Sequence, residues 1–213
     1  MDWPYTVEPT HKEDSYKKLD IYIIKHIIKA NSLYWNQIIP KENKTMKASE
    51  FIGMKVLDKE ANEVGKVAEI AVVFKKCLVD KIFISVGSAL SKKYLVIVDE
   101  DIGEVGDYLQ LKLGKTGIND QVKVDKIEDF IGKGTRFKDF IGKTVLTKTG
   151  MDVGKITDMV IDPKGCLIHN IIVTTGGTLN KKHLMISDDD IISIGDYMIL
   201  KLTKEDVEAK IID

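Results

Sequence analysis

Cysteine is scarce in this chain, where only Cys77 and Cys166 occur among 213 residues. A disulfide scaffold needs more cysteines at closer spacing. A structural zinc site needs four ligands, which two cysteines without histidines at ligand spacing do not supply. We interpret both cysteines as small buried apolar residues, and the sequence predicts neither a metal site nor a cofactor.

An excess of one charge is also missing, since 32 basic residues face 33 acidic ones and the net charge is -1. Nucleic-acid binding draws much of its affinity from a basic excess, so nucleic acid is not the expected partner. The sequence has no apolar run of the ~20 residues that a membrane helix needs. It also has no clear export signal, which favours a cytoplasmic protein.

An internal repeat is the dominant feature that is present. The stretch Phe51–Leu57 returns 89 positions later as Phe140–Leu146, and the ungapped match extends to Leu113 and Leu202. By direct count, 28 of the 63 aligned pairs are identical. The period is too long and the copies are too few for a solenoid. We therefore predict two similar small domains, with repeats at residues 49–113 and 138–202, a linker at 114–137 and a polar tail at 203–213.

Residues 1–48 resemble neither repeat. Apolar residues recur there at spacings of three and four, which predicts an amphipathic helix over residues 15–34. We interpret the segment as a helical extension, or as a stretch upstream of a natural start at Met46. Its polar face is basic and Trp35 lies near one end, so membrane-surface contact through residues 15–35 is a less favoured alternative.

Short strands separated by turns fill each repeat, so the predicted fold class is all-β. The third strand, at residues 79–86 and again at 168–175, is apolar on both faces. It is either buried on both sides or buried on one side, with Phe83 and Ile172 forming a contact surface. The acidic runs Asp99–Asp101 and Asp188–Asp190 are typical of the start of a helical turn.

The order of motifs resembles the PRC-barrel domain. Both copies have a Phe-Ile-Gly-x-x-Val opening, a Val-Gly-Lys entry, a Leu-x-Ile strand that leads to Asp-x-Asp-Ile, and a closing Gly-Asp-Tyr strand. The resemblance implies two tandem six-stranded β-barrels that hold other macromolecules and do not catalyse. Relatives include a domain of the bacterial ribosome-maturation factor for the small subunit. They also include small archaeal adaptors at the cell-division ring.

No catalytic residue follows from this resemblance, and neither His169 nor His183 has a histidine at the equivalent position of the other repeat. The chain is therefore expected to be a non-enzymatic adaptor for protein partners, with a ribosome-assembly or RNA-processing factor as the alternative. The expected partner-binding residues, which would also serve docking between repeats or a homodimer, are Phe83, Ile172, Val96, Met185, Lys92, Lys93, Lys181 and Lys182.

Overall fold

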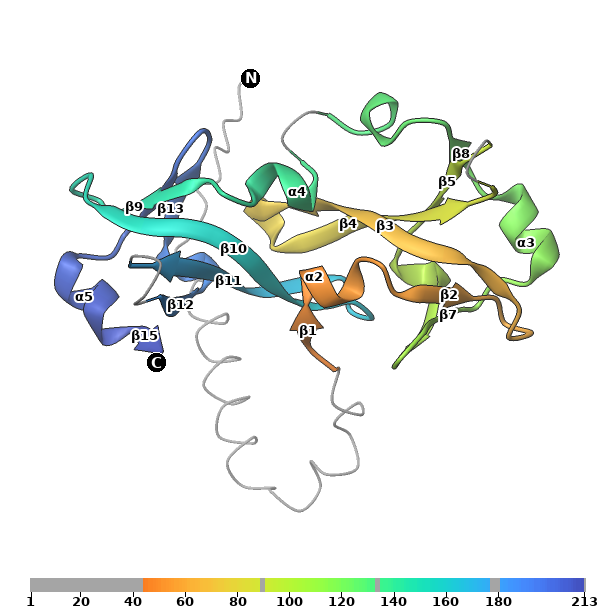
Figure 1. Ribbon diagram of the computed structural model, residues 1–213, viewed down its shortest axis with the longest axis horizontal. Coiled ribbons are helices and arrows are strands. Elements are labelled where there is room, and N and C mark those ends of the chain that lie inside the picture. Colours follow the sequence, from red (N-terminus) through yellow and green to blue (C-terminus); the bar gives the residue numbers. More distant parts are fainter. Residues whose placement is uncertain (1–43, 89–90, 133–134, 177–180, 213) are drawn as a thin grey trace, which may run out of the picture. The chain divides into compact units, whose positions relative to one another are not determined.

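The computed structural model describes residues 44–88, 91–132, 135–176 and 181–212, and Figure 1 shows that strands dominate them. The helix predicted over residues 15–34 lies outside this part of the chain. The predicted all-β class is supported, because the α-helices have only four to six residues each. Within the described ranges, no helix has the length and apolar character needed to cross a bilayer.

Apart from β1, the two repeats contain the same succession of α-helices and β-strands. The first comprises β1 (Met46–Lys47), α2 (Ala48–Phe51), β2 (Lys55–Leu57), β3 (Glu63–Val73), β4 (Leu78–Val86), β5 (Lys93–Ile97), β6 (Ile102–Val105), β7 (Leu109–Leu111), α3 (Lys115–Asp120) and β8 (Lys123–Val124). The second comprises α4 (Phe137–Phe140), β9 (Thr144–Leu146), β10 (Asp152–Asp162), β11 (Leu167–Thr175), β12 (Lys182–Ile186), β13 (Ile191–Ile194), β14 (Met198–Leu200), α5 (Lys204–Ala209) and β15 (Ile211–Ile212). Both acidic runs form the expected helical turns, of the 3₁₀ type.

Each repeat continues beyond Leu113 or Leu202, where the ungapped sequence match ends. The helices α3 and α5 follow at equivalent positions, and the short strands β8 and β15 then pair with β5 and β12. These elements lie in the predicted linker and tail, because the residues of α3 and α5 are not conspicuously alike in the two repeats. Thr203 does carry a capping signal, since its hydroxyl accepts a hydrogen bond from the Asp206 amide at 3.3 Å.

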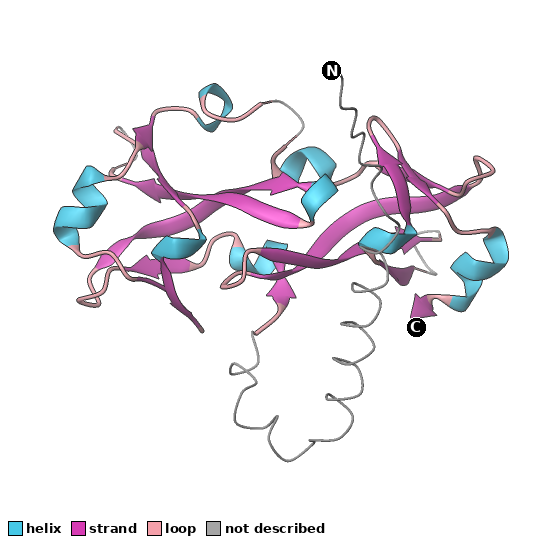
Figure 2. Cartoon of the chain, turned by 180° about the vertical axis from the view of Figure 1, so that it is seen from behind, coloured by secondary structure: helices cyan, strands magenta, loops and turns pink. Residues whose placement is uncertain are grey.

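Strand pairing follows the same order in both repeats. It runs β8-β5-β4-β3-β2-β7-β6 in the first and β15-β12-β11-β10-β9-β14-β13 in the second. The pair β2–β7 and its equivalent β9–β14 are parallel, and the other pairs in these two series are antiparallel. Each repeat is a curled sheet with its short helices at the strand ends (Figure 2).

A bulge bends the long second strand of each repeat at the glycine of the Val-Gly-Lys entry. The register of β3 shifts beside Gly65, and that of β10 shifts beside Gly154. A Cβ at Gly65 would overlap the carbonyl oxygen of Ser85, and one at Gly154 would overlap the carbonyl oxygen of Thr174. Glycine is therefore required at both positions, as expected where a strand bends closely against its neighbour.

The two repeats join about an approximate two-fold axis. Strand β4 pairs with β11 at Leu78 and Leu167, which are equivalent positions of the repeat. The amide of Val79 donates to the carbonyl of Cys166 at 2.9 Å, and the amide of Ile168 donates to the carbonyl of Cys77 at 2.8 Å. These two bonds also link equivalent positions, so the junction has the self-complementary form of a symmetric dimer interface. It merges the described strands into one 15-stranded sheet.

Reciprocal contacts by the segments that enter each repeat reinforce this junction. Strand β1 pairs with β10, where Lys47 lies opposite Val160. At the equivalent place in the other repeat, Arg136 bridges to Ala71 of β3. Each repeat is thus completed by a segment that precedes its twin.

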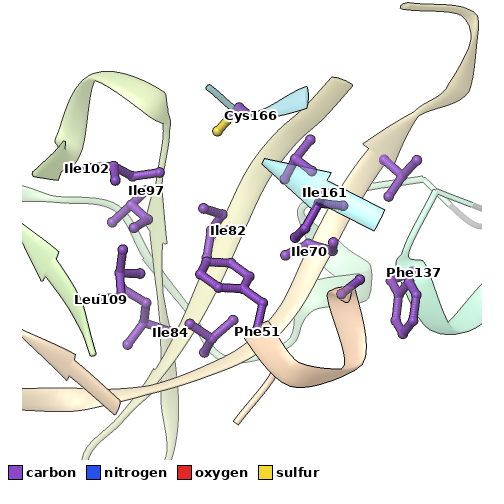
Figure 3. Close-up of a cluster of buried hydrophobic side chains, with 14 of the residues drawn as sticks. Phe51, Ile70, Ile82, Ile84, Ile97, Ile102, Leu109, Phe137, Ile161 and Cys166 are labelled. Atoms are coloured by element: carbon purple, nitrogen blue, oxygen red, sulfur yellow. The ribbon is translucent and has the colours of Figure 1, made fainter. Parts of the chain in front are cut away.

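The hydrophobic core crosses the boundary between the repeats. Figure 3 shows Phe137, Ile161 and Cys166 of the second repeat in one cluster with Phe51 and Ile82 of the first. A separate cluster, built around Ile156, Val173 and Leu184, fills the second repeat. The repeats therefore dock through this shared core and not through the strand faces of Phe83 and Ile172.

Candidate protein-interaction surface

The outer face of the second repeat carries apolar side chains that the described residues leave partly exposed. In the antiparallel register, Ile172 of β11 lies opposite Met185 of β12, and Met185 is 37% exposed. Successive residues of a strand point to opposite faces of the sheet, so Ile171 and Val173 face the core while Ile172 faces outward. We call Ile172, Met185 and the groove around them the second-repeat face.

Polar groups that already have partners border this face. The Thr157 and Thr174 hydroxyls are 2.9 Å apart, and the Thr174 hydroxyl lies 3.0 Å from Nδ1 of His183. The carboxylate of Asp158 accepts hydrogen bonds from the Ser49 amide at 3.1 Å and from the Ser49 hydroxyl. Among the described residues that line the groove, Asp158 supplies the carboxylate, and it is hydrogen-bonded within the chain.

Basic groups complete the lining of the groove, which includes Lys47, Lys181 and His183. Within the described residues, no carboxylate lies within ion-pairing distance of the Lys47 ammonium. The second-repeat face therefore combines an apolar centre with a basic rim, a composition suited to a partner that carries apolar and acidic groups.

The equivalent face of the first repeat is covered by the linker. Phe83 is 0% exposed and Val96 is 6% exposed, and both pack in a buried cluster with Ile127 of the linker. The ring of Phe130 meets that of Phe83 edge to face, with centroids 6.2 Å apart. We call the surface formed by Phe83, Val96 and the neighbouring Ala71 the first-repeat face.

This burial differs from the expectation that Phe83 and Val96 present a surface to a partner. After β8, which pairs with β5, the linker places Ile127 over the apolar side chains. Burying apolar area at about 25 cal/mol per Å² favours such a cover. The spacing of Ile127, Phe130 and Ile131 was the available signal, but it could not show which surface these residues meet.

An ion-pair cluster anchors the linker over the first-repeat face. Glu128 pairs with the Arg136 guanidinium and lies 3.7 Å from the Lys138 ammonium. Arg136 also binds Asp139 at 2.8 Å, and its side chain is only 14% exposed. By the repeat offset, Arg136 is equivalent to Lys47, so the same rim position carries a cation in both repeats.

A buried carboxylate lies beneath this cluster. Glu69 is 4% exposed and accepts a hydrogen bond from the Ile70 amide at 3.1 Å. Burial raises the pKa of Glu69, and the Ile70 amide, Lys138 and Arg136 oppose this rise. Its equivalent in the second repeat is Asp158, which Ser49 satisfies instead.

The paired lysines Lys92-Lys93 and Lys181-Lys182, predicted to bind a partner, do not form one basic patch. Lys92 lies 5.3 Å from the centroid of the Tyr94 ring, and Lys93 is 3.8 Å from Asp125. Lys181 is exposed and lines the second-repeat face, whereas Lys182 is half-buried in β12. Only Lys181 among the four is therefore placed beside Ile172 and Met185.

The two cysteines flank the junction of the repeats as free thiols. Burial, reinforced by Asp188, raises the pKa of Cys77 to about 11. Burial, reinforced by Asp99, raises that of Cys166 to about 12. Such thiols are poor nucleophiles and ligands at neutral pH. In the part of the chain that the structure describes, no group of three His, Cys, Asp or Glu side chains is placed to hold a metal ion.

A protein-family model matches part of this chain. No curated protein matches the chain. Residues 133–207, which run from before α4 into α5 of the second repeat, match the model of the PRC-barrel domain. This stretch of the chain is thus similar to a family of small β domains that serve as protein-interaction modules.

Proposed function

We propose that this chain is a non-catalytic adaptor built from two tandem PRC-barrel domains, and that it binds a partner protein through the second-repeat face. The family similarity of residues 133–207 supports an interaction module. One observation favours the second-repeat face as the binding surface. Two equivalent apolar faces occur in the described chain, and the linker covers the first but not the second.

The apolar centre of the second-repeat face supports binding to a protein more than to RNA. Interface affinity comes chiefly from a few well-buried apolar or aromatic anchors, whereas charges at the rim contribute less. Ile172 and Met185 are placed to be such anchors. The rim carries Lys47 and Lys181, while Lys92 and Lys93 lie apart in the first repeat, so the lysines do not supply the dense phosphate contacts of a nucleic-acid site.

Affinity purification of the full chain, followed by mass spectrometry, tests this function. The wild type is compared with Met185→Asp, and with Met151→Asp as a control at a methionine that is 43% exposed in the turn after β9. We expect a protein that stays bound from about 50 to about 300 mM salt, because apolar contacts are not screened. It should be retained by Met151→Asp and lost from Met185→Asp.

Two results would refute the proposal. One is that the same proteins co-purify with the wild type and with Met185→Asp. The other is that ribosomal RNA co-purifies and is lost when Lys92, Lys93, Lys181 and Lys182 are replaced by Glu. The second result would identify a ribosome-assembly or RNA-processing factor.

A further inference from the structure

The linker on the first-repeat face shows what kind of segment this sheet surface accepts. Residues 127–130 read Ile-Glu-Asp-Phe, with an apolar residue at each end and two acidic residues between them. Ile127 is 7% exposed in the buried cluster, and Phe130 packs on Phe83. Glu128 binds Arg136 at the rim. Two apolar anchors and one acidic contact thus hold the segment down.

The second-repeat face repeats the groups that receive these contacts. Ile172 and Met185 stand at the positions of Phe83 and Val96, and Lys47 stands at that of Arg136, each 89 residues away. The register is also repeated, because Phe83 lies opposite Val96 as Ile172 lies opposite Met185. The second-repeat face therefore has the same apolar centre and the same cation at its rim, but no segment of the described residues covers it.

Charge restricts the occupant further. The cations Lys47 and Lys181 line the groove, whereas its carboxylate, Asp158, is only 8% exposed and accepts hydrogen bonds from Ser49. An acidic segment would gain a partner for Lys47, whereas a basic segment would meet like charge. A second copy of this chain is less suited, because its own Ile127 is already buried on its first-repeat face.

From this equivalence we infer that the second-repeat face binds a short segment of a partner protein in which two apolar residues flank acidic ones on a 3₁₀ turn, the conformation of residues 127–129. The segment lies across β11 and β12 as residues 127–130 lie across β4 and β5. Its apolar residues cover Ile172 and Met185, and its carboxylate meets Lys47. This inference rests on the proposed function and names the chemistry of the partner.

A synthetic peptide that copies residues 121–132 serves as the probe, with a fluorophore at its N-terminus. Fluorescence anisotropy measures its binding to the full-length protein. We expect saturable binding that Met185→Asp weakens by about tenfold or more, since an anchor is replaced by a charge. The control Met151→Asp should bind as the wild type does. Thermal melting of each variant verifies that it is folded.

The acidic contact is tested by charge exchange. Lys47→Glu should lower the affinity for the probe by about fivefold, which corresponds to the loss of one partly exposed ion pair. A peptide with Lys in place of Glu128 and Asp129 should bind Lys47→Glu better than it binds the wild type. Recovery of this kind would not follow from a merely structural role of Lys47.

Several outcomes would overturn the inference. They are equal binding of the probe to the wild type and to Met185→Asp, and no preference of the reversed peptide for Lys47→Glu. A photo-cross-link from position 185 to the same chain, or a dimer in sedimentation that Met185→Asp abolishes, would assign another occupant. If the probe fails while a purified partner still depends on Met185, only the inference is wrong. If no partner depends on Met185, the proposed function is wrong as well.

Discussion

Replacing Met159 with alanine should destabilise both repeats together. Met159 belongs to β10 of the second repeat, yet it is 0% exposed in the cluster that contains Ala48 and Phe51 of the first. The substitution removes three heavy atoms from this shared core. Truncations of this kind cost about 2–5 kcal/mol, because transfer free energy is lost and a cavity remains.

The size of this loss can be compared with the whole stability of the protein. Domains are stable by only about 5–15 kcal/mol. In chains of this size, each kcal/mol lowers the melting temperature by about 2–4 °C. A loss of about 3 kcal/mol therefore predicts a melting temperature lower by roughly 10 °C. The control Met151→Ala should change stability by less than about 0.5 kcal/mol, since Met151 is 43% exposed in a turn outside the buried clusters.

Calorimetry and hydrogen exchange together test the reasoning. Calorimetry of the full chain should give one transition that moves downward as a whole. The amides of Ile84, in the first repeat, and Leu184, in the second, should lose protection in parallel. Two separate transitions, of which only one moves, would show that the repeats are energetically independent in spite of their common core.

Three further predictions concern single groups. For Glu69, burial raises the pKa above its ordinary value of 4.5, so the folded state holds the proton more tightly than the unfolded state does. The free energy of unfolding should therefore fall as the pH rises from about 4.5 through the folded-state pKa. Glu69→Gln should flatten this fall in urea denaturation, and an unchanged slope would contradict the assignment. The pKa of Cys77 is about 11 and that of Cys166 about 12. At pH 8 the thiols of the folded protein should therefore react slowly with iodoacetamide, and those of the unfolded protein in denaturant should react quickly. Equal rates in the two states would contradict this. Ile127→Ala should cost about 2–4 kcal/mol and increase the fluorescence of a hydrophobic dye, because it uncovers Phe83; an unaltered melting temperature would argue against the cover.

Much of the architecture follows from local sequence pattern. The strands around Gly65 and Gly154, the acidic 3₁₀ turns and the all-β class are fixed by alternation, turn residues and close backbone approach, which short stretches of sequence express. The repeat itself implied that equivalent residues would occupy equivalent places. The apolar third strand also predicted that Phe83 and Ile172 face away from the inner core.

Only the tertiary structure decided which of those two faces is covered. Both alternatives for the third strand occur. The strand is buried on both sides at Phe83, and it is buried on one side only at Ile172. The sequence identifies Ile127 and Met185 alike as apolar residues, but contacts between segments distant in the chain decide which of them is covered. Lys47 likewise acquires its place at the rim only because β1 pairs with β10 of the other repeat. Sequence periodicity reports the faces of one strand, whereas the partner of each face depends on how distant segments pack.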